Sequence, residues 1–214
     1  MNKLKLWITK WKYDHNLKAI ISAFGSLAVT MAFAAYNGFL GIYCSSLWHG
    51  TICVYYIVLS ILRGMIIKRL RSQQKASRKK EYITASVLLL TLNLCLIAPI
   101  CIMVVQQKPV HMTLIPAITM AAYTTYKVTM ASVHLKRRRR SGNGLIRLLR
   151  TISFIDALVS ILTLQNTLIM VSTKETMPEM LALTAITSGA VWIVILLLSV
   201  SAFISSIRDP ETNQ

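Results

Sequence analysis

Six long apolar runs, separated by short polar segments, divide this chain of 214 residues. Each run is about 20 residues long, which is the length that an α-helix needs to cross roughly 30 Å of hydrocarbon. The pattern predicts an all-α polytopic membrane protein with six transmembrane helices arranged as three hairpins. The predicted helices are Ala19–Tyr43, Leu47–Ile67, Tyr82–Val105, Val110–Leu135, Thr151–Ser172 and Leu181–Ile207.

The polar segments between these runs leave no room for a separate soluble catalytic or nucleotide-binding domain. We therefore expect one transmembrane domain over residues 19–207, preceded by a cytoplasmic segment (1–18) and followed by a short cytoplasmic tail (208–214). The first run is longer than a signal-peptide core and lacks a small-residue cleavage site, so we interpret it as a retained helix.

The segment before the first run has an amphipathic pattern of its own. Leu4, Trp7, Ile8 and Trp11 recur at helical spacing, and lysines occupy the other face. This pattern is typical of an interfacial helix that lies on the cytoplasmic headgroups with Trp at the boundary. The alternative is a polar linker that contains two Trp residues.

The basic residues alternate between the two sides of the predicted helices. Of 24 Lys and Arg residues, five precede the first helix, seven lie between helices two and three, seven between helices four and five, and one follows helix six. The other three connections contain only Lys108 and Lys174. Because basic loops stay in the cytoplasm, we expect both termini to be cytoplasmic in a plasma membrane protein.

Composition supports a membrane protein and bears on its partners. The chain is 55% hydrophobic and 14% charged, whereas soluble proteins carry about 25% charged residues. Its formal charge of +17 follows from the basic cytoplasmic loops, so we expect the lipid bilayer and anionic lipids as partners and no nucleic acid. A homodimer or a larger membrane complex is compatible with so small a bundle.

Three ionisable residues fall inside the predicted membrane region, where charge is costly and usually functional. Arg63, Lys127 and Asp156 lie about 7, 13 and 9 Å inside the cytoplasmic boundary at 1.5 Å per residue. Their similar depths predict a common polar site. Lys127 and Arg63 would supply a positive site for an anionic or zwitterionic ligand, with Asp156 as counter-charge or as a titrating group in a proton-coupled cycle.

Each charged residue belongs to a polar stripe with helical spacing, which places the stripe on one face of its helix. If the stripes converge, they line a cavity open to the cytoplasm. The other stripe residues that we assign to the candidate site are Tyr56 on helix two, Tyr123 on helix four, Ser160 and Thr163 on helix five, Asn37 on helix one and Asn93 on helix three.

Structural roles compete with this interpretation. Arg63 is close enough to the boundary to extend its guanidinium to the headgroups. Lys127 and Asp156 are also compatible with an ion pair that only joins helices four and five. Ser and Thr on membrane helices often serve close packing or bond to their own backbone.

Other chemistry has weaker support. His49 and His111 stand at outer helix ends, but two histidines without a carboxylate are a weak metal signal. The four cysteines show no metal-binding spacing. The sequence contains no Gly-rich phosphate-binding loop, no paired catalytic carboxylates and no HExxH or GxSxG motif, and we expect no cofactor.

Two segments carry a local resemblance. Trp48–Gly64 (WHGTICVYYIVLSILRG) and Phe154–Gln165 (FIDALVSILTLQ) resemble segments of uncharacterised multi-pass membrane proteins of Gram-positive bacteria. That resemblance implies a membrane protein and assigns no activity.

Three functions remain open from the sequence. The first is a small transporter or substrate-binding membrane subunit with its site among helices two, four and five. The second is a non-catalytic membrane partner whose basic loops, such as Arg137–Arg140, dock a cytoplasmic protein or anionic lipid. The third is a membrane-embedded lipid-modifying enzyme that uses the histidines or the cytoplasmic charges.

Overall fold

The computed structural model describes residues 15–71, 78–106, 114–136, 144–172 and 178–208. In these ranges it is all-helical, with seven α-helices and no strand. The helices are α2 (His15–Tyr43), α3 (Leu47–Arg71), α4 (Arg78–Cys95), α5 (Ile97–Gln106), α6 (Leu114–Lys136), α7 (Gly144–Ser172) and α8 (Pro178–Arg208). The expected interfacial helix falls mostly within residues 1–14, outside the described residues.

Helices occupy all six apolar runs, and one of them is interrupted. The run Tyr82–Val105 forms α4 and α5, which are separated at Leu96. Pro99 explains the break, because proline has no N–H to donate to the carbonyl of Cys95 and its ring clashes with that carbonyl. α7 begins at Gly144, before the predicted start of the fifth helix at Thr151, and Leu145 and Leu149 are buried in its first turns.

Within the part of the chain that the structure describes, four stretches are long and apolar enough to cross a membrane: Phe24–Tyr43, Leu47–Leu70, Lys80–Cys101 and Ala182–Arg208. The helices that carry Lys127 and Asp156, α6 and α7, are 23 and 29 residues long but are not among the four. The structure thus supports a helical membrane protein, and the count of six spans stays a prediction.

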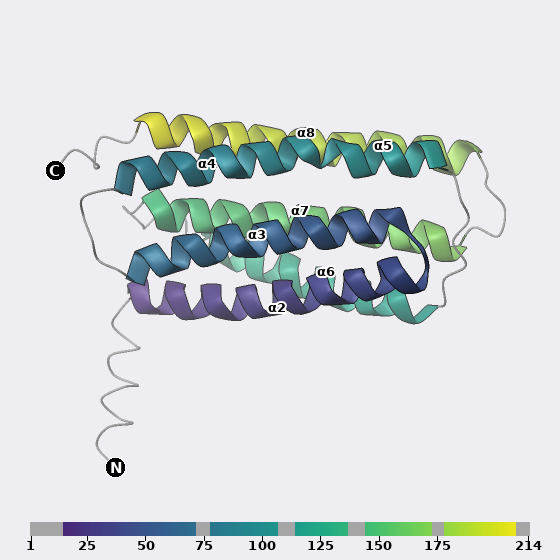
Figure 1. Cartoon of the computed structure of the whole chain (residues 1–214), viewed down its shortest axis with the longest axis horizontal. Coiled ribbons are helices and arrows are strands. Elements are labelled where there is room, and N and C mark those ends of the chain that lie inside the picture. The colour runs from purple at the N-terminus through teal and green to yellow at the C-terminus, as the bar shows by residue number, and fades with distance from the viewer. Residues whose placement is uncertain (1–14, 72–77, 107–113, 137–143, 173–177, 209–214) are drawn as a thin grey trace, which may run out of the picture.

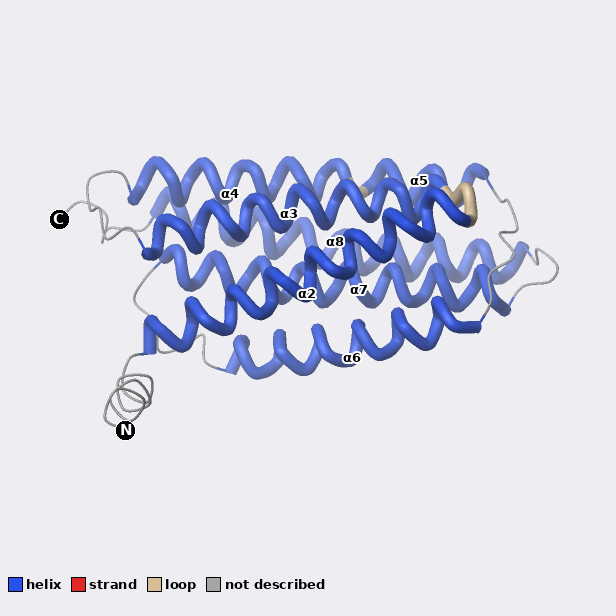
Figure 2. Tube along the Cα trace, turned by 60° about the horizontal axis from the view of Figure 1, so that its bottom comes forward, coloured by secondary structure: helices blue, strands red, loops and turns tan. Residues whose placement is uncertain are grey.

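The helices run side by side as a bundle (Figure 1). A tight turn at Cys44–Ser46 joins α2 to α3, with the Ser46 amide donating to the Gly41 carbonyl at 3.0 Å, and it is visible as a loop in Figure 2. Close to this turn the two helix backbones nearly touch. A Cβ on Gly41 would lie 2.9 Å from the Gly50 nitrogen, so the approach requires glycine.

The helices that pack on one another are not all the pairs that three consecutive hairpins would give. α2 packs on α3 and α6 on α7, but α4 packs mainly on α8. α7 also contacts α3, α4 and α8, so it is a central helix. In Figure 1, α4 and α5 lie along one side of the bundle and α6 along the other. The predicted pairing of the third and fourth spans is therefore not confirmed.

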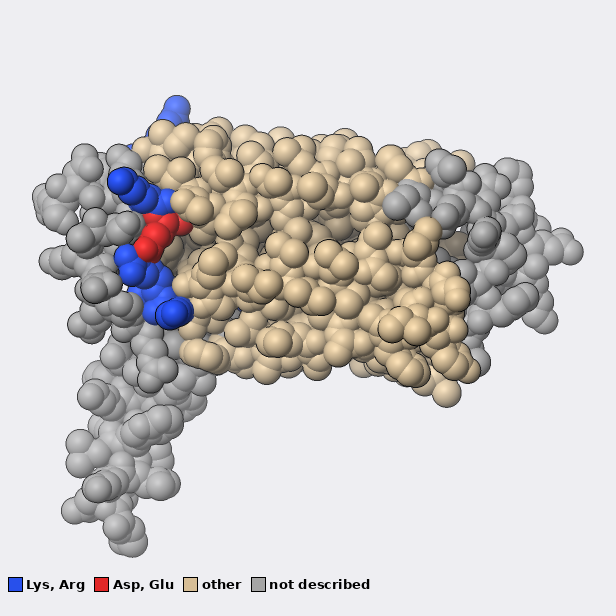
Figure 3. Space-filling model, in the orientation of Figure 1, with Lys and Arg blue, Asp and Glu red and all other residues tan. Residues whose placement is uncertain are grey.

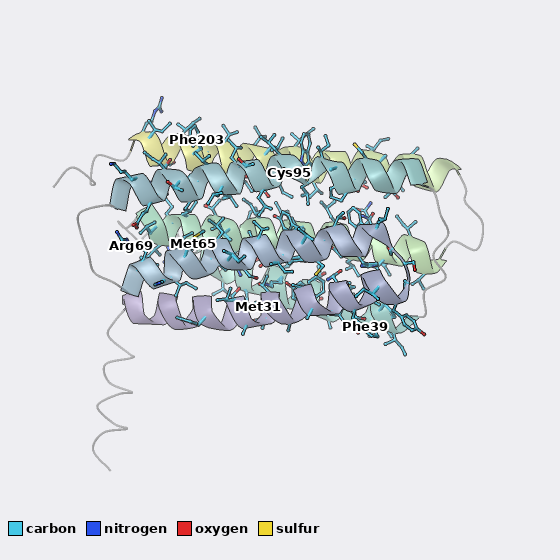
Figure 4. All side chains as sticks on the ribbon, viewed as in Figure 1. Met31, Phe39, Met65, Arg69, Cys95 and Phe203 are labelled. Atoms are coloured by element: carbon cyan, nitrogen blue, oxygen red, sulfur yellow. The ribbon has the colours of Figure 1, made fainter. Side chains whose placement is uncertain are left out.

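The sides of the bundle are apolar, and on the face that Figure 3 shows the described surface charges gather at one end. Large apolar side chains point outward, including Met31 (58% exposed), Phe39 (61%) and Met65 (48%) (Figure 4). On the face shown in Figure 3, the described Lys and Arg residues cluster at the end where α3 terminates and α4 begins. We call this the basic end. An apolar belt with charge at one end suits a molecule that is surrounded by lipid.

Candidate functional site: a buried charge cluster

The three charged residues that the sequence predicts inside the membrane meet on one carboxylate oxygen. Oδ2 of Asp156 on α7 lies 3.0 Å from Nη2 of Arg63 on α3 and 2.5 Å from Nζ of Lys127 on α6. The side chains of Arg63 and Asp156 are 1% and 0% exposed in the first pair, and that of Lys127 is 3% exposed. Arg63 therefore does not extend to the headgroups.

Three hydroxyl side chains, those of Ser26, Thr30 and Ser153, surround the charged groups. We call these three residues together with Arg63, Lys127 and Asp156 the charge cluster. Arg63 Nη1 donates to Ser26 Oγ at 2.8 Å and to Thr30 Oγ1 at 3.2 Å. Arg63 Nη2 lies 3.4 Å from Ser153 Oγ. The guanidinium thus connects α3 to α2 and α7.

Thr30 on α2, like Asp156, contacts several other members of the charge cluster. Its Oγ1 accepts a hydrogen bond from Lys127 Nζ at 2.5 Å and lies 3.2 Å from Asp156 Oδ2 and 2.8 Å from the Ser26 carbonyl. A hydroxyl has two acceptor lone pairs and one donor, so Thr30 accepts from both cations and donates to one oxygen. Thr30 was not among the predicted site residues.

The charge cluster is electrically unbalanced. Two cations face one carboxylate, so its formal charge is one positive unit. A buried charge is stable only when it is paired and hydrogen-bonded. Ser26, Thr30 and Ser153 supply hydrogen bonds but no negative charge. The arrangement favours an additional anionic group.

Aromatic rings form the wall next to the charges. Phe33 of α2 stacks on Tyr123 of α6 with ring centroids 3.5 Å apart, and Tyr56 of α3 meets Phe33 edge-on at 5.2 Å. Lys127 Nζ lies 5.3 Å from the Tyr123 ring centroid, within the range of a cation–π interaction. Of the two predicted tyrosines, Tyr123 therefore adjoins the cluster directly and Tyr56 packs on Phe33 behind it. The apolar Phe33 carried no sequence signal for a site.

Several buried polar atoms in the charge cluster or elsewhere on its helices have no hydrogen-bond partner among the described residues. They are Asp156 Oδ1, Arg63 Nε, Ser60 Oγ and, farther along α7, both amide atoms of Asn166. Buried polar groups are almost always satisfied by protein, water or ligand. These atoms mark where a polar ligand or water would find unsatisfied donors and acceptors.

Two of the expected site residues lie on α7 but bond to their own helix. Ser160 Oγ donates to the Ala157 carbonyl at 2.7 Å, and Thr163 Oγ1 donates to the Val159 carbonyl at 2.9 Å. Both side chains are fully buried. The carbonyl of Ser160 also accepts from Thr124 of α6 at 3.1 Å, so this part of the stripe fastens α6 to α7.

Asn37 lies outside the charge cluster, paired with His49. Its Nδ2 donates to the Phe33 carbonyl at 2.9 Å, which leaves Oδ1 to accept from His49 Nδ1 at 3.1 Å. His49 is completely buried, so it does not stand at an open outer surface. His111 lies outside the described residues, and within the described ranges no three potential metal ligands come together.

Asn93 belongs to a third polar network, between α3, α4 and α8. Its Oδ1 accepts from the Tyr55 hydroxyl at 2.9 Å, and its Nδ2 donates to Ser199 Oγ at 2.7 Å. Trp192 Nε1 donates to the backbone carbonyl of Asn93 at 3.0 Å. The structure therefore separates Asn37 and Asn93 from the three charges.

The known proteins add no functional information here, because no family model, curated protein or solved structure matches the chain.

Proposed function

We propose that this protein is a small membrane transporter, or the substrate-binding membrane subunit of one, and that the charge cluster binds an anionic or zwitterionic ligand. One observation carries the proposal: two buried cations share a single carboxylate oxygen. A ligand that brings one negative charge would balance the site.

The helices that meet at the cluster suit a transport cycle. Arg63, Lys127 and Asp156 stand on three different helices, and Thr30 adds a fourth. A ligand anion that competes with Asp156 for Arg63 or Lys127 would loosen contacts between these helices. Such competition is a differential interaction, which a ligand needs in order to shift a conformational equilibrium.

The membrane topology that we propose has six spans with both termini in the cytoplasm of a plasma membrane protein. The described ends of α2 and α8, His15 and Arg208, lie at the same end of the bundle (Figure 1), which supports an even number of crossings. The cluster then lies in the cytoplasmic half, and a homodimer remains part of this proposal.

The test is the thermal unfolding of detergent-purified protein with acetate, phosphate or bromide, at an ionic strength kept constant with a large organic sulfonate. A ligand at 100 times its Kd stabilises a protein by about 2.7 kcal/mol. This corresponds to a rise in Tm of roughly 5–11 °C for a chain of this size. We expect at least one of these anions to raise the Tm of the wild type.

Charge-changing variants give the test its specificity. Lys127→Met makes the cluster neutral and should abolish the rise, whereas Asp156→Asn increases the positive charge and should retain it. Lys80→Met removes an exposed charge on α4 and serves as the matched control. An equal response in Lys127→Met and in the wild type would reject binding at the cluster.

Compounds that co-purify with the protein would identify its substrate. Mass spectrometry of small anions released from the wild type and depleted in Lys127→Met would identify the substrate class. In reconstituted transport of that compound, Asp156→Asn should abolish coupling, and Asp156→Ala should also destabilise the fold. Normal transport in both variants would discredit the role of Asp156.

A further inference from the structure

A groove of about 490 Å³ runs along α8 at the basic end, away from the charge cluster. Its lining residues on α8 are spaced at helical intervals, so they form one stripe along the helix. Arg147 of α7 adds a second side to the groove. On α8 the groove is lined by Leu197, Val200, Ser201, Ile204, Ser205 and Arg208.

Polarity changes along the groove. Arg208 and Arg147 lie at its basic end, whereas Leu197, 65% exposed, lies at the other end. Val200 and Ile204, at 40% and 44% exposed, present apolar surface between them. The groove is thus cationic where the bundle meets water and apolar where it meets hydrocarbon.

The length of the apolar part matches one lipid leaflet. Leu197 lies about 16 Å from Arg208 along the helix axis at 1.5 Å per residue. One leaflet contributes about 15 Å, half of the roughly 30 Å hydrocarbon thickness. An acyl chain lying along Leu197, Val200 and Ile204 would therefore have its headgroup beside the two arginines.

The arginines suit a phosphate group. Guanidinium groups bind phosphate through parallel N–H donors, which is stronger and more directional than binding by lysine. Arg147 Nη2 lies 3.5 Å from the hydroxyl of Tyr82, a buried residue of α4, so its guanidinium is held beside the groove. The hydroxyl of Ser205 adds a donor nearby, and the described lining residues include no carboxylate.

We propose that this groove binds one anionic phospholipid, with the phosphate at Arg147 and Arg208 and one acyl chain along α8. The site lies outside the charge cluster, so this inference goes beyond the proposed function and stands or fails separately from it. The net positive charge predicts a general attraction to anionic lipids, and this proposal gives that attraction a defined binding site. The lipid would fasten α8 to α7 at the cytoplasmic leaflet.

The experiment is native mass spectrometry of the full chain with equal amounts of phosphatidylglycerol and phosphatidylcholine. The wild type should retain one phosphatidylglycerol in preference to phosphatidylcholine. Arg208→Gln, an exposed position at the end of α8, should weaken that binding by about tenfold, and Arg147→Gln/Arg208→Gln should remove the preference. Lys68→Gln/Lys80→Gln removes the same charge from exposed positions at the same end and should leave the preference intact.

A second pair of variants tests the apolar part without changing charge. Ser201→Trp fills the groove and should prevent lipid retention, whereas Ile186→Trp, at an exposed position near the other end of α8, should not. Thermal unfolding in detergent verifies that each variant is folded.

Three results would overturn the proposal. Equal losses in the arginine and lysine double variants would indicate general electrostatics. Retention by Ser201→Trp equal to that of wild type would exclude the groove. Displacement of the lipid by inorganic phosphate at a comparable concentration would assign the arginines to free phosphate instead.

Discussion

Replacing Asp156 with Asn tests whether the buried charges form one coupled unit. The two side chains have nearly the same shape, but the amide carries no charge, so Arg63 and Lys127 lose their common counter-ion. Removing one partner of a buried ion pair typically costs about 3–5 kcal/mol. A typical protein is stable by only about 5–15 kcal/mol, so this loss is a large fraction. We expect the Tm to fall by roughly 6–20 °C.

A double-mutant cycle separates charge coupling from lost packing. Lys127→Met in the Asp156→Asn background returns the cluster to one positive unit. We therefore expect the double variant to be more stable than Asp156→Asn alone, with an interaction free energy of about 0.5–3 kcal/mol. The assay is thermal unfolding of the four proteins in one detergent, followed by tryptophan fluorescence. Transfer to a second detergent serves as a check on the ranking.

A partly exposed salt bridge serves as the reference for the Tm change of Asp156→Asn. Arg69 of α3 and Glu81 of α4 form a salt bridge whose side chains are 26% and 35% exposed. Exposed pairs contribute about 0–1 kcal/mol, so Glu81→Gln should change the Tm little. If Asp156→Asn is as mild as Glu81→Gln, or if the two cluster substitutions are additive, the reasoning about a coupled buried cluster is refuted.

Two further predictions concern helix packing away from the charge cluster. Gly41→Ala should destabilise the protein by about 1–3 kcal/mol through overpacking against Gly50. Gly25→Ala, where an added Cβ has no atom within 4 Å, should leave the stability unchanged. Equal Tm values for the two variants would contradict the close approach of α2 and α3. Tyr55→Phe should cost about 1–3 kcal/mol because it leaves the buried Asn93 Oδ1 without its donor. In the Tyr55→Phe background, Asn93→Leu should lower the stability by less than it does in the wild type. If the two effects on thermal unfolding are strictly additive, the hydrogen bond between Tyr55 and Asn93 is disproved.

Long apolar runs were sufficient to predict where most of the described helices lie, because a helix that crosses a membrane must satisfy its backbone internally and face lipid. The exception is α4–α5, where Pro99 interrupts the hydrogen bonding at Cys95. Pro99 was visible in the sequence, but prolines also occur in continuous membrane helices, so its effect depends on the surrounding packing.

The charged part of the site was predictable and its polar surroundings were not. Similar predicted depths in the membrane indicated that Arg63, Lys127 and Asp156 would meet, since a charge inside a bilayer needs a partner. Depth and face within one helix do not determine which helices are neighbours. Asn93 consequently joined a different network, because α4 packs on α8, and Asn37 lies two turns beyond Thr30, about 10 Å along α2.

The charge cluster as an anion site is tested most directly by a crystal structure grown in a lipidic mesophase containing bromide, whose anomalous scattering locates the ion. We predict a bromide peak beside Arg63 and Lys127 in the wild type, and its absence in Lys127→Met crystals. Anomalous peaks confined to the basic end, with the interior of the bundle empty in both proteins, would contradict the account.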